Sequence, residues 1–101
     1  MAEFRCFPGE SLRIGVDGLT DPATGDYVTS LGAGGTATYA VTRTSDGTSI
    51  ATGALTGGTL GDWYATVTMS TTPGRYKIKR TMVVTGLGTR IFVDYVEVEP
   101  E

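Results

Sequence analysis

The chain has 101 residues, a length that suits one domain and excludes two ordinary ones. It is 40% hydrophobic and 19% charged, which is typical of a folded protein and not of a disordered one. The net charge of −3 and the pI near 4.8 argue against a generally basic, nucleic-acid-binding domain. No apolar run approaches the roughly 20 residues that cross a bilayer, and the first residues lack the basic and apolar regions of a secretory signal.

Short segments of alternating apolar and polar residues follow one another along the chain, separated by turn signals such as Pro8-Gly9, Asp46-Gly47 and Pro73-Gly74. The predicted strands span residues 4–7, 11–16, 36–44, 48–55, 62–69, 75–84 and 89–98. A short strand at 27–29 could lie inside the long irregular stretch 17–35. Asp-Gly readily adopts the positive φ angles of a tight hairpin, so strands 36–44 and 48–55 are predicted to be antiparallel neighbours.

Residues 75–84 give the clearest pattern, because Tyr76, Ile78, Met82 and Val84 share one face. This strand is predicted to pair with strand 89–98 and with the strand that begins near Trp63. Arg80 lies on the apolar face. Its stem could be buried with the guanidinium reaching the sheet edge, or it could mark a bulge that turns the side chain outward. We expect the guanidinium to pair with an acid, with Asp94 the first candidate.

The last strand breaks its own alternation. Ile91, Val93 and Tyr95 share one parity, whereas Val96 and Val98 have the other. A β-bulge near Tyr95-Val96 would produce such a shift. The alternative is that Phe92, Val96 and Val98 face one core and that Asp94 sits where the strand leaves it. In either case the strand is expected to bend there.

No segment has helical periodicity over three turns, and turn signals recur every eight to twelve residues. The sequence therefore predicts an all-β protein, specifically an immunoglobulin-like antiparallel β-sandwich of about seven or eight strands, with a small β-barrel as the alternative. We expect one domain over residues 1–101. The ends, about 1–8 and 97–101, are candidates for mobile arms that order only in an assembly.

The sequence offers little catalytic chemistry. Histidine is absent, which removes the commonest general base and metal ligand. Cys6 is the only cysteine; it lies between two phenylalanines and is expected to be a buried apolar residue. Asp17, Asp21 and Asp26 share one loop, but their spacing favours turns over a calcium site. We therefore expect no enzyme, no cofactor and no metal site.

Charge is distributed in blocks. Residues 75–93 carry five basic residues and no acid, and residues 94–101 carry four acids and no base. Adjacent blocks of opposite sign suggest pairing within the fold or between copies of it. The predicted partner interface consists of Arg75, Lys77, Lys79, Arg90, Glu97 and Glu99. The alternatives are a plain solvated strand face and a nucleic-acid face.

The order of these features resembles a known group of proteins. A Gly9-Glu10 pair precedes the first clear strand, Pro73-Gly74-Arg75-Tyr76 enters a later one, and Val96-Glu97-Val98-Glu99-Pro100 closes the chain. This order is similar to that of small immunoglobulin-like modules in the virions of tailed bacteriophages, found in head, neck and tail.

The resemblance implies a structural protein that is made in the host cytoplasm and located in the virion. It would pack in many copies on the capsid as a decoration protein or at the neck, against itself and against capsid, portal or tail proteins. It implies neither a nucleic-acid nor a membrane partner. The alternative is a module that binds carbohydrate or a cell surface through Tyr27, Tyr64 or Trp63, although Trp63 is expected in the core.

Overall fold

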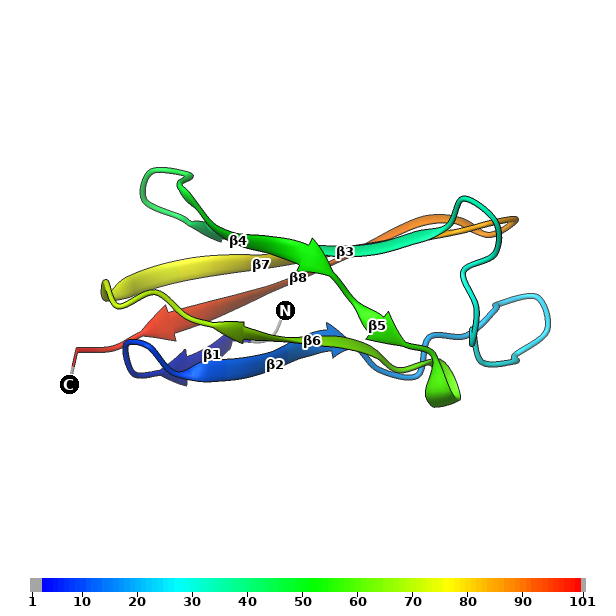
Figure 1. Cartoon of the computed structure of the whole chain (residues 1–101), viewed down its shortest axis with the longest axis horizontal. Coiled ribbons are helices and arrows are strands. Elements are labelled where there is room, and N and C mark those ends of the chain that lie inside the picture. Colours follow the sequence, from blue (N-terminus) through cyan, green and yellow to red (C-terminus); the bar gives the residue numbers. More distant parts are fainter. Residues whose placement is uncertain (1–2, 101) are drawn as a thin grey trace.

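The structure is a computed structural model that describes residues 3–100, and it is built almost entirely of β-strands in two layers (Figure 1). The strands are β1 (Glu3–Cys6), β2 (Ser11–Val16), β3 (Thr36–Arg43), β4 (Ser49–Ala54), β5 (Thr56–Gly57), β6 (Trp63–Thr68), β7 (Gly74–Val84) and β8 (Gly88–Val98). One 3-10 turn, η1 (Thr59–Gly61), precedes β6. The predicted strands are present, with the ends displaced by one or two residues, and the expected turn at Asp46-Gly47 has Gly47 at φ 72°.

The two layers are a five-stranded sheet in the order β1-β8-β7-β3-β4 and a three-stranded sheet in the order β2-β6-β5. All neighbours are antiparallel except β1 and β8, which are parallel. Strand β7 pairs with β8, as expected, and with β3. The predicted pairing of β7 with the strand at Trp63 was wrong, because β6 lies in the other sheet. Alternation shows which face of a strand is buried, and not which strand lies beside it.

Tyr76 identifies the kind of sandwich. It lies near the start of β7, its side chain is fully buried, and its hydroxyl donates a hydrogen bond to the Thr72 carbonyl oxygen at 2.6 Å. This arrangement is the tyrosine corner of immunoglobulin-like domains, in which a tyrosine near the start of the strand that follows the sheet-to-sheet crossing bonds back to the chain just upstream. Together with the two packed sheets it defines an immunoglobulin-like β-sandwich.

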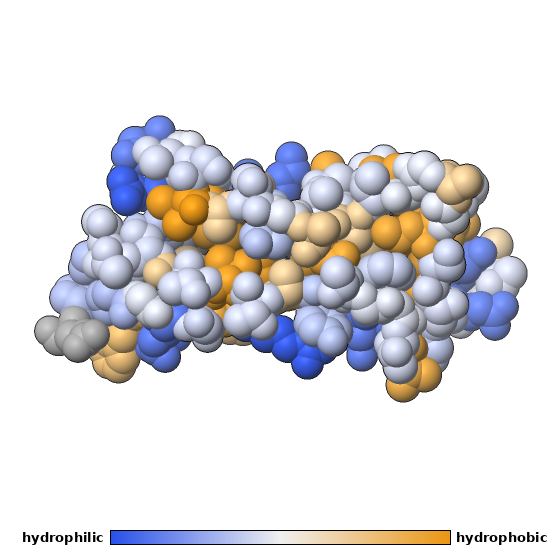
Figure 2. Space-filling view, viewed as in Figure 1, coloured by the Kyte–Doolittle hydropathy of each residue, from blue (hydrophilic) through white to orange (hydrophobic). Residues whose placement is uncertain are grey.

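The core fills the space between the sheets in two clusters. One is centred on Tyr76, Ile78 and Val96, and the other on Trp63, Met82 and Leu55. Figure 2 shows apolar side chains gathered along the band between the two layers. Trp63 is 8% exposed and donates its indole N–H to the Val28 carbonyl oxygen at 3.1 Å, which attaches the long 17–35 loop to the small sheet.

Strand β8 runs beside β7 without a register shift, from Val98 opposite Gly74 to Gly88 opposite Val84. The predicted bulge is therefore wrong. The alternative is confirmed for the three core-facing residues but is wrong for Asp94, which pairs with Arg80 between the sheets and does not mark the point where the strand leaves the core. Phe92, Val96 and Val98 face the core, with Asp94 between them. The outward residues Ile91, Val93 and Tyr95 are apolar as well. With apolar residues on both faces, the strand shows the same sequence pattern that a bulge would produce.

The first and last strands of the chain lie side by side. Strand β1 runs along the end of β8, with Cys6 opposite Val98, and the Glu99 amide donates to the Cys6 carbonyl oxygen at 2.8 Å. Of the segments expected to be arms, residues 1, 2 and 101 lie outside the described residues, and ordering of the ends upon assembly stays a prediction. In the 17–35 loop, an isolated bridge between Thr20 and Tyr27 replaces the suggested strand at 27–29.

Candidate functional site

The outward face of the five-stranded sheet carries most of the residues predicted to form an interface. Along β7, the side chains of Tyr76, Ile78 and Arg80 are buried, and those between them point outward. On β8 the outward residues include exposed Ile91 and half-buried Val93 and Tyr95. We call this surface the outer patch. It consists of Arg75, Lys77, Lys79, Ile91, Val93 and Tyr95.

The register between β7 and β8 mixes charge with apolar surface in the outer patch. Lys77 is directly opposite Tyr95, and Lys79 is opposite Val93. Ile91 lies further along the same face and is 55% exposed. Residues that are directly opposite share a face of the sheet, so two ammonium groups flank an apolar strip. The lysines could be predicted from the sequence. The apolar strip was not predicted, although the odd-numbered apolar series of β8 was its signal.

Within residues 3–100, the acids at the end of the chain lie beside only part of this positive charge. Arg75 lies opposite Glu97, and its guanidinium carbon is 4.3 Å from the centre of the Tyr95 ring. Glu99 pairs with Arg5 on β1 at 3.0 Å. Within residues 3–100, neither Lys77 nor Lys79 makes an ion pair with an acid. The predicted acids Glu97 and Glu99 therefore lie near one end of the patch.

Arg90 does not belong to the outer patch. As predicted, it lies on the strand adjacent to β7, but it pairs with Met82, whose side chain is fully buried against the core. Directly opposite residues share a face, so Arg90 is on the inward side of the sheet, at its hairpin end, where it is exposed. The structure thus separates Arg90 from Arg75, Lys77 and Lys79.

Arg80 points between the two sheets, on the same face of β7 as the buried apolar residues of that strand. Its Nη2 lies 2.6 Å from Oδ2 of Asp94, which confirms the predicted pair, and its Nη1 donates to the Gly15 carbonyl oxygen at 2.8 Å. Its Nε is buried without a hydrogen-bond partner among the described residues. The guanidinium therefore connects β7 and β8 of the large sheet to β2 of the small one.

The aromatic side chains expected to bind a ligand do not converge in the described structure. Trp63 belongs to the core. Tyr27 and Tyr64 are exposed, by 52% and 41%, but they lie on different segments, and the guanidinium carbon of Arg13 is 4.1 Å from the centre of the Tyr64 ring. One face of Tyr64 is therefore covered by an arginine.

Acidic and thiol groups occupy structural positions. Asp21 accepts hydrogen bonds from the Ala23 amide through its carboxylate and from the Gly25 amide through its carbonyl, which is turn chemistry. No group of three or more histidine, cysteine or acidic side chains that could hold a metal ion occurs in the described part of the chain. Cys6 is buried, and this burial raises the pKa of its thiol, with a smaller contribution from the negative charge of Glu10.

Comparison with known proteins gave no family model, no curated protein and no solved structure that matches this chain. None of the helices in residues 3–100 has the length and apolar character needed to span a membrane.

Proposed function

We propose that this protein is a non-enzymatic structural subunit of a tailed-bacteriophage virion, present in many copies on the capsid or at the head–tail region. In this role its outer patch contacts a neighbouring copy or another virion protein. The proposal joins the resemblance in feature order to the chemistry of the outer patch.

The observation that carries the proposal is the position of Lys77 and Lys79. Both project from β7, the central strand of the five-stranded sheet. Neither has an acidic partner within residues 3–100, and exposed Ile91 lies on the same face. An apolar strip beside cations is suited to an acidic protein surface, where charge guides orientation and burial of the aliphatic groups stabilises the contact.

The most direct test is the protein composition of particles produced from the genome that encodes this chain. Gradient-purified particles, analysed by quantitative mass spectrometry, are expected to contain the chain at a fixed copy number per capsid or per tail. Its absence from intact particles would contradict the proposal. A carbohydrate-binding module, the alternative, would instead bind on a glycan array and lose binding when Tyr27 and Tyr64 are replaced by alanine.

A further inference from the structure

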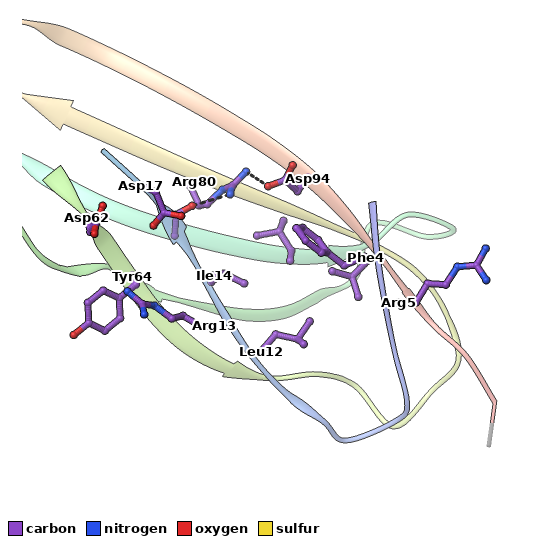
Figure 3. Close-up of a pocket in the computed structure, with 13 residues that line it drawn as sticks. Phe4, Arg5, Leu12, Arg13, Ile14, Asp17, Asp62, Tyr64, Arg80 and Asp94 are labelled. Atoms are coloured by element: carbon purple, nitrogen blue, oxygen red, sulfur yellow. Dashed lines mark hydrogen bonds and ion pairs between the residues drawn. The ribbon is translucent and has the colours of Figure 1, made fainter. Parts of the chain in front are cut away.

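An open cleft lies between the two sheets at the edge formed by β1 and β2 (Figure 3). Its volume is about 640 Å³, within the range of pockets that hold small ligands or peptide side chains. Apolar residues from both sheets line it: Phe4, Leu12, Ile14, Ile78 and Val96. Arg80 and Asp94 lie in its wall, and Arg13 is at its rim.

Phe4 shows that the cleft is under-filled. It pairs with Val96, a fully buried core residue, and therefore lies on the inward side of the large sheet. Even so, Phe4 is 51% exposed. An inward-facing aromatic ring that remains half in solvent indicates that the layer opposite it lacks a covering element.

The missing element corresponds to a strand position. In constant-type immunoglobulin domains, the sheet that faces the GFC sheet has four strands, A, B, E and D. Here the equivalent sheet has three, β2-β6-β5, and the first described strand pairs with β8 in the other sheet. Within residues 3–100, no strand pairs with β2 on the side away from β6.

The backbone of β2 presents hydrogen-bonding groups to this side. In an antiparallel pair, alternate residues bond to the partner strand, and the residues between them direct both N–H and C=O away from it. Glu10 bonds to Met69 across the β2–β6 ladder, whereas the Gly15 carbonyl bonds to Arg80 instead. Even-numbered residues thus face β6, and Ser11, Arg13 and Gly15 direct their main-chain groups to the free edge.

We propose that the free edge of β2 accepts an extended strand from another protein chain, which completes the small sheet and fills the cleft. Apolar side chains at alternate positions of that strand face Phe4, Leu12 and Ile14. Because Arg13 is on the outward side of β2, an acidic residue of the incoming strand is favoured beside it. This is strand addition, in which main-chain bonds give affinity and alternate side-chain pockets give specificity. It does not depend on a virion role.

The test uses the whole chain and one synthetic probe, the peptide acetyl-Thr-Val-Glu-Val-Glu-Val-Thr-amide. Amide hydrogen exchange is followed by NMR with and without the peptide. We expect the N–H groups of Arg13 and Gly15 to exchange at least about tenfold more slowly at saturating peptide, since they gain main-chain partners. Those of Leu12 and Ile14, which already bond to β6, should not change. No slowing at Arg13 and Gly15 up to millimolar peptide, or slowing confined to another strand edge, would overturn the proposal.

Two matched changes separate backbone pairing from charge. Arg13→Pro removes an edge N–H without removing a bond to β6, and edge strands tolerate proline. Arg13→Pro should lower the affinity for the peptide by about tenfold or more relative to Arg13→Ala, which removes only the side chain. A peptide N-methylated at alternate residues tests the same bonds without altering the protein, so a folding defect in Arg13→Pro does not affect the outcome. Equal affinity of the methylated and unmethylated peptides would contradict strand addition.

Discussion

Oδ2 of Asp94 lies 2.6 Å from Nη2 of Arg80, and the two side chains are only 19% and 10% exposed. A pair in this position contributes to the stability of the fold mainly because each charge compensates the other, so that neither is buried unpaired between the sheets. Removing one partner of a buried pair typically costs about 3–5 kcal/mol, whereas replacing both with apolar residues is often neutral or stabilising.

Asp94→Ala is therefore expected to lower the free energy of unfolding by about 3–5 kcal/mol in a urea titration. The double variant Arg80→Met with Asp94→Leu should recover most of this loss, because no charge is left unpaired. A loss below about 1 kcal/mol for Asp94→Ala would show that solvent reaches the guanidinium and that the pair is not buried in solution.

Tyr76→Phe tests the tyrosine corner. The hydroxyl is the only group removed, and its 2.6 Å bond to the Thr72 carbonyl connects the start of β7 to the crossing between the sheets. We expect a loss of about 1–2 kcal/mol in the free energy of unfolding. Tyr95→Phe on the same sheet is the control and should change stability by less than about 0.5 kcal/mol. Equal effects at the two positions would contradict the corner's role.

Trp63 should be the most sensitive core position. Trp63→Ala removes a large buried ring and is expected to cost about 3–5 kcal/mol. Trp63→Phe keeps most of the ring but loses the bond to the Val28 carbonyl, so it should cost less and increase hydrogen exchange in the 17–35 loop. A loss under about 1 kcal/mol in the free energy of unfolding for Trp63→Ala would indicate that the indole is in solvent and would support a role in ligand binding.

The buried thiol of Cys6 should make the stability of the protein depend on pH. Burial raises the pKa of its thiol in the folded protein, so the folded state retains the proton after the unfolded state has lost it. This contribution to stability is complete below the unfolded pKa of about 8.5 and decreases as the pH rises above that value. Urea titrations between pH 7 and 10 should show a steeper loss for the wild type than for Cys6→Ala. Parallel pH profiles would contradict the assignment.

The strands could be predicted from the sequence because period-two alternation is a local property. Residues 11–16 and 75–84 alternate clearly, and both ranges match the structure closely. Strand neighbours are not local. The pattern at Trp63 fits a strand in either sheet, and for this reason the β6–β7 pairing was predicted wrongly.

The faces of the candidate site depended on register. The three-residue connection between Val84 and Gly88 places Arg90 opposite Met82, on the inward face. A one-residue shift of that register would have placed Arg90 opposite Thr81 or Val83, on the outward face that carries Lys77 and Lys79. The cleft at β2 could not be predicted either, because it depends on β1 pairing with β8 instead of with the small sheet.

Charge reversal tests directly whether the outer patch contacts another protein. Lys77→Glu with Lys79→Glu reverses the patch, and Arg90→Glu reverses an exposed arginine on the opposite face of the same sheet. All three side chains are outside the core, so the free energy of unfolding of each variant should lie within about 0.5 kcal/mol of the wild-type value.

The decisive measurement is the copy number of each variant in purified particles. We expect Arg90→Glu to be incorporated like the wild type and the double lysine variant to be absent from the particles. Wild-type incorporation should also weaken with added salt, since charges are screened beyond about 8 Å at physiological ionic strength. Incorporation of the double lysine variant at the wild-type level would contradict a virion contact through the outer patch.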